Sequence, residues 1–108
     1  MSKGTIILVP FPFTDLSGHK VRPALVIYEE KRGEDCVVVF ISSLTTKKVG
    51  PFEVTIKATE TNGLKVDSLL KVSKIATLQK KIILGELGRL EDKILKAVDN
   101  CLKSMFHL

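Results

Sequence analysis

The 108-residue sequence has no tryptophan, only two cysteines and few arginines. Two cysteines are too few for a disulfide framework, and the apolar neighbours of Cys36 and Cys101 predict reduced thiols in the core. The cysteines and histidines show no paired spacing typical of a zinc site, and no acidic cluster indicates a magnesium site. We therefore expect neither a metal nor a cofactor.

Long apolar runs are also missing, because no stretch approaches the roughly 20 residues that a membrane-spanning helix needs. Residues 1–4 lead into strand-like sequence rather than into the apolar segment of a signal peptide. These features predict a cytoplasmic protein that does not bind membranes. At 108 residues the chain is long enough for one core and too short for two, so residues 1–108 are expected to form a single domain.

The formal net charge of +5 comes mostly from lysine and favours an acidic partner. That partner is nucleic acid, an anionic membrane surface or an acidic protein segment, and charge alone does not choose among them. Arg22, Arg32 and Arg89 are the only arginines, so few residues are candidates for bidentate recognition of a phosphate group.

Apolar and β-branched runs separated by turn residues predict a small antiparallel sheet. The first expected strand, Thr5–Val9, stops at Pro10, and an irregular loop follows over residues 10–21. Helical spacing from Asp92 onward predicts one amphipathic helix, and Asn62-Gly63 predicts a tight turn. The other expected strands are Ala24–Tyr28, Cys36–Ile41, Phe52–Ile56, Asp67–Val72 with a weaker continuation through Thr77, and Gly85–Gly88. This order is typical of an α+β, mainly β domain that closes as a small SH3-like or OB-like barrel.

The end of the expected loop combines a histidine, a lysine and an arginine beside an apolar strand. Arg22 is suited to bind a phosphate group through two nitrogens, and Lys20 adds positive charge. The imidazole of His19, whose unperturbed pKa is about 6.5, suits proton transfer. These residues also fit a solvated basic loop, and Ser42 and Ser43 fit ordinary turn residues at a strand end. Composition leaves both interpretations open.

Three blocks that together span nearly the whole chain resemble the MazF/PemK family of toxins. The first block has the spacing of the family's amino-terminal signature and comprises Gly4–Ile6, Pro12–Gly18 and Lys20–Ile27. The second is similar to the family's usual Ile/Val-Thr-Ser motif and the strand after it, and comprises Ile41–Ser43 and Phe52–Val54. The third block comprises Asp67-Ser68, Ile75–Leu78 and Leu87–Leu90, before the expected helix.

The resemblance implies an SH3-like β-barrel of the MazF/CcdB toxin type with a C-terminal α-helix. It also implies a homodimer and an endoribonuclease toxin of a type II toxin–antitoxin system. The implied reaction is metal-independent cleavage of single-stranded RNA, such as mRNA, by attack of the 2′-OH on its own 3′ phosphate. The expected protein partner is a cognate acidic antitoxin with a partly disordered segment.

By position, the resemblance makes Arg22 the counterpart of the family's catalytic arginine and Ser42 the counterpart of its catalytic threonine. Arg22 is expected to stabilise the charged phosphorane, and Ser42 to contact the scissile phosphate or orient the 2′-OH. His19 is the candidate for proton transfer. The family often has an acidic residue and an arginine where this chain has Ser73 and Ala76, so the general base stays open. The expected RNA-binding residues are Lys20, Ser43, Lys47, Lys48 and Lys71.

Two other functions are compatible with the sequence. A gyrase-directed toxin resembling the CcdB group would use its terminal helix against a protein, but residues 104–108 lack the tryptophan-containing end of that group. A catalytically inert module that binds RNA or a protein on the same fold is compatible with Ser73 and Ala76. We rank the ribonuclease first and the inert module second.

Overall fold

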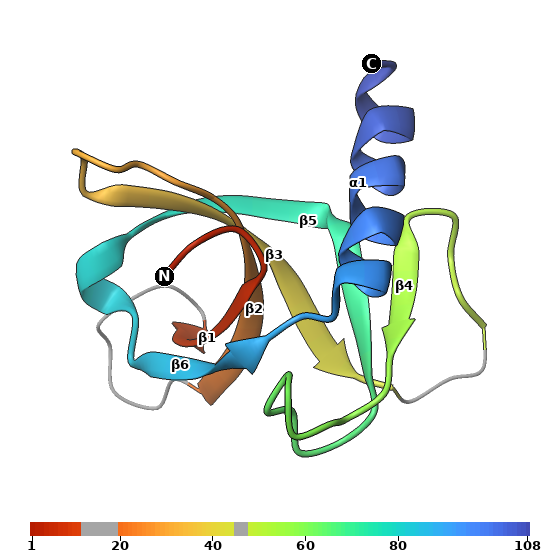
Figure 1. Cartoon of the computed structure of the whole chain (residues 1–108), viewed down its shortest axis with the longest axis horizontal. Coiled ribbons are helices and arrows are strands. Elements are labelled where there is room, and N and C mark those ends of the chain that lie inside the picture. The colour runs from red at the N-terminus through yellow and green to blue at the C-terminus, as the bar shows by residue number, and fades with distance from the viewer. Residues whose placement is uncertain (12–19, 45–47) are drawn as a thin grey trace.

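The computed structural model describes residues 1–11, 20–44 and 48–108 (Figure 1). Within these residues, six antiparallel strands form one curled sheet in the order β4-β5-β3-β2-β1-β6. The strands are β1 (Thr5–Phe11), β2 (Lys20–Glu29), β3 (Asp35–Ser43), β4 (Glu53–Ile56), β5 (Ser68–Gln79) and β6 (Gly85–Arg89). A 3₁₀ helix, η1 (Lys80–Ile82), joins β5 to β6, and the helix α1 (Asp92–Phe106) follows β6. This arrangement confirms the expected mainly β fold with a C-terminal helix.

β1 shows that the prediction of a strand ending before Pro10 is wrong. The strand continues to Phe11, and Pro10 pairs with Val21 of β2. On its other side β1 pairs with β6 only as far as Leu8, which lies opposite Gly85. β1 therefore has a single strand neighbour at Pro10, where a residue without an N–H group fits the unpaired side. At its other end, the expected loop over residues 10–21 is also too long, because residues 20–21 already belong to β2. Residues 12–19 lie outside the described residues.

β5 is bent at its middle, where the pairing with β3 shifts. Phe40 pairs with Lys71, whereas the preceding residue, Val39, pairs with Ile75. Residues 72–74 therefore form a bulge, which bends a strand and changes the direction of its side chains. The weaker continuation expected after residue 72 is thus the second half of a single twelve-residue strand.

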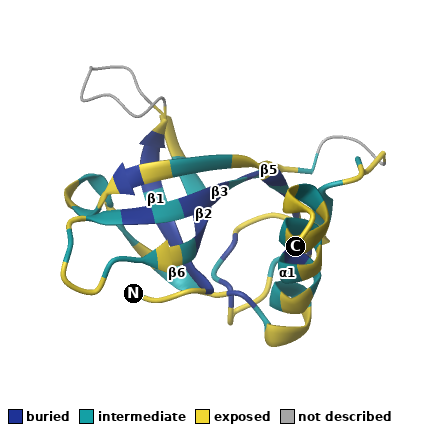
Figure 2. Ribbon diagram, turned by 90° about the horizontal axis from the view of Figure 1, so that it is seen from above, coloured by how far each residue is buried: buried dark blue, intermediate teal, exposed yellow. Residues whose placement is uncertain are grey.

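Apolar side chains pack on both faces of the sheet, because successive residues of a strand point to opposite faces. One core cluster includes the helix α1 and contains Ile6, Leu25, Val39, Leu70 and Val98. The second core cluster lies on the opposite face and contains Ile7, Val9, Ala24, Val26 and Val38. Figure 2 shows that buried positions concentrate in the strands, whereas loops and one side of α1 are exposed. Neither face of the central strands is left to water.

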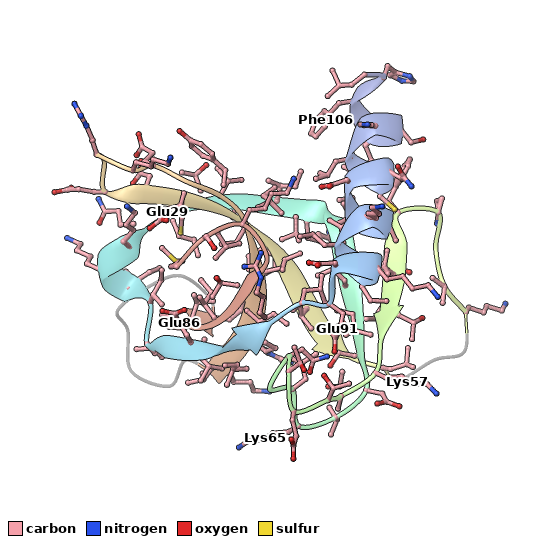
Figure 3. The ribbon with its side chains drawn as sticks, in the orientation of Figure 1. Glu29, Lys57, Lys65, Glu86, Glu91 and Phe106 are labelled. Carbon is pink, nitrogen blue, oxygen red and sulfur yellow. The ribbon has the colours of Figure 1, made fainter. Side chains whose placement is uncertain are left out.

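α1 confirms the helix that the sequence predicted from Asp92 onward, and it packs against β4 and β5. Glu91 precedes the helix but makes no side-chain hydrogen bond to its first N–H groups. Its carboxylate instead accepts hydrogen bonds from the Thr59 hydroxyl at 2.6 Å and from the Asn62 side-chain amide at 3.2 Å. The start of α1 is therefore fastened to the loop between β4 and β5 (Figure 3).

Both cysteines are free thiols, as the sequence predicted. Burial raises the pKa of the Cys36 thiol, which keeps this group protonated and unreactive. Among the described residues, no group of three or more histidine, cysteine or acidic side chains is placed to hold a metal ion. In the same part of the chain, no helix has the length and apolar character needed to cross a membrane.

Candidate active site

The start of β2 and the end of β3 meet the middle of β5 at a cavity of about 360 Å³. We name it the first cavity. Arg22 of β2, Ser42 of β3 and Lys71 of β5 all line it. Its full lining comprises Phe11, Arg22, Phe40, Ile41, Ser42, Lys71 and Lys74. Three strands thus bring together residues that the sequence analysis selected from separate motifs.

The register of the sheet explains why these side chains meet. Ala24 pairs with Phe40, and Phe40 pairs with Lys71, so the three residues share one face. Arg22 and Ser42 each lie two residues away from a member of this row, and alternate residues of a strand point to the same face. A guanidinium, a hydroxyl and an ammonium group are therefore held on the face of the second core cluster.

Phe11 and Phe40 form an aromatic wall of the first cavity. Their rings meet edge to face, with centroids 5.9 Å apart and an interplanar angle of 72°. Phe11 is 43% exposed, so part of its ring is accessible to a ligand. Aromatic rings beside basic groups are typical of sites where unpaired bases stack. Neither ring was predicted as part of the site, because the first strand was expected to end before Pro10. A strand that extends past Pro10 places Phe11 on the face of Arg22.

Lys74 is a further lining residue that the sequence analysis missed. In a regular strand, Lys71 and Lys74 would point to opposite faces because they are three residues apart. The bulge over residues 72–74 breaks this alternation, so both lysines line the first cavity. The sequence carries no local signal for such a bulge, because it arises only when β5 pairs with β3.

The first cavity carries an excess of positive charge. In the part of the chain that the structure describes, the ion pairs are Lys3 with Asp99 and Lys80 with Glu29, so the three basic residues of the cavity have no acidic partner there. Such a concentration of cations attracts a polyanion and raises its local concentration. Arg22 is half-buried, and a guanidinium in a partly desolvated place binds phosphate more strongly than in water.

None of the other expected site residues that the structure describes lines the first cavity. Lys20 is exposed at the start of β2, and Lys48 is exposed beyond the end of β3. Ser43 points to the opposite face and lines a different cavity. His19 and Lys47 lie outside the described residues, so their expected roles rest on the sequence alone.

A second cavity of about 340 Å³ adjoins the first on the opposite face of the strand ends, and Arg22 and Ile41 line both. Its other lining residues are mostly apolar, and they are Leu8, Val21, Pro23, Ser43, Leu64, Lys65, Val66, Ser68 and Leu87. Leu64, Lys65 and Val66 belong to the loop between β4 and β5. Arg22 therefore stands at the boundary between a basic aromatic cavity and a largely apolar one.

The two positions where the resembling family often has charged residues do not line the first cavity. Ser73 is exposed within the bulge of β5. Ala76 pairs with Val38 and packs against the second core cluster. A general base is therefore not supplied by these positions.

The family is established by a match over almost the whole chain. Residues 2–106 match the model of the family described as PemK-like, MazF-like toxin of type II toxin–antitoxin system. The protein belongs to this family, as its sequence motifs predicted. No curated protein matches its sequence.

Solved structures share the fold over the full length of this chain. MazF from Deinococcus radiodurans is 20% identical, with a TM-score of 0.78 over 100% of this chain and 97% of that chain. MazF in the MazE–MazF structure from the same organism is 19% identical, with a TM-score of 0.79 over 100% of this chain and 96% of that chain. An endoribonuclease from a mycobacterial species, in complex with its cognate antitoxin, is 16% identical. Its TM-score is 0.77 over 100% of this chain and 96% of that chain. These likenesses confirm the MazF-type fold.

Proposed function

We propose that this protein is a metal-independent endoribonuclease toxin that cuts single-stranded RNA, including mRNA, and thereby inhibits growth. The observation that carries the proposal is the first cavity, where Arg22, Ser42 and Lys71 meet on one face of the sheet beside two aromatic rings. Membership of the toxin family and the likeness to solved endoribonucleases support it.

Cleavage at this site uses no nucleophile from the protein. The 2′-OH of the RNA attacks the adjacent phosphorus, and the bond to the 5′ oxygen of the next nucleotide breaks. The products are a 2′,3′-cyclic phosphate and a 5′-OH, and the proton of the 2′-OH ends on the leaving oxygen after transfer through a base and an acid. DNA lacks the attacking hydroxyl and is therefore not a substrate.

Each residue of the site has a proposed role in this reaction. Arg22 holds two phosphate oxygens and stabilises the negative charge that grows on the phosphorane. Ser42 donates a hydrogen bond to the phosphate or orients the 2′-OH. His19, whose unperturbed pKa is about 6.5, is assigned to proton transfer. Phe11 provides a ring for stacking of a base. Lys71 and Lys74, which line the cavity, contribute to RNA binding through their positive charge. The same role is proposed for Lys20, Lys47, Lys48 and the hydroxyl of Ser43.

Purified protein is expected to cut a long single-stranded RNA at discrete positions in the presence of EDTA, because no step of the reaction involves a metal. Mapping of the ends should find 2′,3′-cyclic phosphates and 5′-hydroxyls. Double-stranded RNA and single-stranded DNA of the same sequence serve as controls that stay intact. RNA that binds to saturation and remains uncut would identify an inert binding module instead.

We also propose that residues 1–108 act as one cytoplasmic domain in a homodimer, and that an acidic antitoxin segment neutralises the site. The basic first cavity and exposed apolar residues such as Val21 and Val66 suit such a segment. The MazE–MazF structure of a similar toxin supports this partner. Light scattering at micromolar protein is expected to give twice the 11.9 kDa of one chain, and an acidic antitoxin peptide should block RNA cleavage. A monomeric mass, or cleavage that the peptide leaves unchanged, contradicts the respective assignment.

A further inference from the structure

The second cavity has one wall that the sheet does not provide. Leu64, Lys65 and Val66 supply it from the loop between β4 and β5, residues 57–67. Figure 3 shows Lys57 and Lys65 at well-separated positions on this loop. A loop keeps such residues in place only when its backbone is fastened to the rest of the molecule.

Asn62 fastens the loop from within, and its side chain is fully buried at 0% exposure. Its Oδ1 accepts hydrogen bonds from the N–H groups of Thr59 at 3.1 Å and Leu64 at 3.0 Å. Its Nδ2 donates to the carbonyl of Lys57 at 2.8 Å and to Oε1 of Glu91 at 3.2 Å. All four hydrogen-bonding positions of the amide are thus occupied, which selects one loop conformation.

Glu91 connects this loop to the start of α1. One of its carboxylate oxygens accepts from Asn62, and the other accepts from the Thr59 hydroxyl at 2.6 Å. The Thr59 hydroxyl oxygen in turn accepts from the N–H of Asn62 at 3.1 Å. The hydrogen bond from Thr59 lowers the pKa of Glu91, so the carboxylate stays charged well below neutral pH. We name Thr59, Asn62 and Glu91 the loop clamp.

We propose that the loop clamp positions the wall of the second cavity to hold a nucleoside of the RNA whose phosphate binds Arg22. This inference rests on the proposed function, because the phosphate that contacts Arg22 is the scissile phosphate of the RNA substrate. The two cavities share Arg22 and Ile41. An RNA chain whose phosphate contacts Arg22 in the first cavity can therefore continue into the second cavity. The mostly apolar lining suits the flat ring of a base, and Ser43 and Lys65 supply polar groups for its edge or its phosphate.

Thr59, Asn62 and Glu91 line neither cavity, so they act as positioning residues. Glu91→Ala is expected to raise KM for RNA about tenfold with kcat nearly unchanged, because it removes two hydrogen bonds to a charged group that hold the loop. Glu60→Ala removes an exposed carboxylate of the same loop and should behave as wild type. Asp92→Ala removes a carboxylate from the same end of α1. It shows whether the loss of a negative charge beside the helix dipole accounts for any effect of Glu91→Ala.

Lys65→Gln tests the cavity itself, because Lys65 lines it and takes no part in the clamp. This variant is expected to raise KM and to change the preferred base beside the cut. Lys57→Gln, on the same loop but outside both cavities, should leave both properties unchanged. If Glu91→Ala fails to fold, the comparison of Lys65→Gln with Lys57→Gln still tests whether the second cavity binds a nucleoside. Equal KM values and base preferences for the two lysine variants would overturn the inference.

Amide hydrogen exchange, measured without RNA, reports how firmly the loop clamp holds the loop between β4 and β5. Glu91→Ala is expected to speed exchange in residues 59–66 and to leave β3 protected. A wild-type protein that cuts no RNA refutes the proposed function. Cleavage by the wild type, with exchange and KM both unchanged in Glu91→Ala, refutes the inference alone. A Lys65→Gln protein that becomes monomeric while keeping its KM also contradicts the inference, because the cavity is then a contact between two copies.

Discussion

Arg22→Ala is expected to lower the rate of RNA cleavage by about 10²-fold or more, the usual cost of losing one group that stabilises a developing oxyanion. Arg22 is half-buried and lines the first cavity, so its guanidinium is only partly hydrated and is suited to bind a phosphate strongly. Arg22→Lys should restore little activity, because an ammonium group cannot meet two phosphate oxygens with the planar fork of a guanidinium. Single-turnover rates at saturating RNA measure this effect on the chemical step.

Two other variants separate chemistry from charge in the same assay. Ser42→Ala, which removes the hydroxyl of the first cavity, should slow cleavage even at saturating RNA. Lys48→Ala should weaken RNA binding and reduce its dependence on salt while the saturated rate is kept, because the proposed role of Lys48 is to bind phosphate away from the reacting group. An Arg22→Ala protein that cuts saturating RNA at the wild-type rate would remove Arg22 from the mechanism and leave it a structural role at the start of β2.

The order of the elements could be predicted because each central strand is an apolar run bounded by turn residues. The expected strands Ala24–Tyr28 and Cys36–Ile41 lie inside β2 and β3, which extend further at both ends. The bend of β5 could not be predicted, because a change of register depends on which residues of β3 face it. Local sequence predicts the strands, whereas pairing determines their irregularities.

The same distinction separates the predicted site residues from the missed ones. Arg22 and Ser42 belong to recognisable motifs, and the sheet places them in one cavity. Lys74 reaches that cavity only through the bulge of β5. For Asn62, the local sequence predicted only a tight turn with Gly63. Its hydrogen bond to Glu91 could not be predicted, because the two residues are 29 positions apart. Residues whose role depends on such distant contacts carry no local signal.

Gly63→Ala is expected to destabilise the fold by about 3 kcal/mol, the sum of the cost of a left-handed backbone for an L-residue and of forced overlap in a packed region. Gly63 has a φ of 72°, which favours glycine. A Cβ atom at this position would lie 2.2 Å from the carbonyl oxygen of Leu87 and 2.7 Å from its carbonyl carbon. Those atoms belong to the backbone of β6, which pairs with β1, so they cannot move aside without disturbing the edge of the sheet.

Gly85→Ala is the matched control for this prediction, because a Cβ atom at Gly85 in β6 meets no atom within 4 Å. Its expected effect is near zero or slightly stabilising, since alanine also restricts the unfolded chain. Urea unfolding of both variants measures the difference, and a lower midpoint at an unchanged m-value assigns the loss to stability. Equal midpoints for the two variants would mean that the loop does not lie against β6 in solution. The wall that Leu64, Lys65 and Val66 give to the second cavity would then lack its contact with β6.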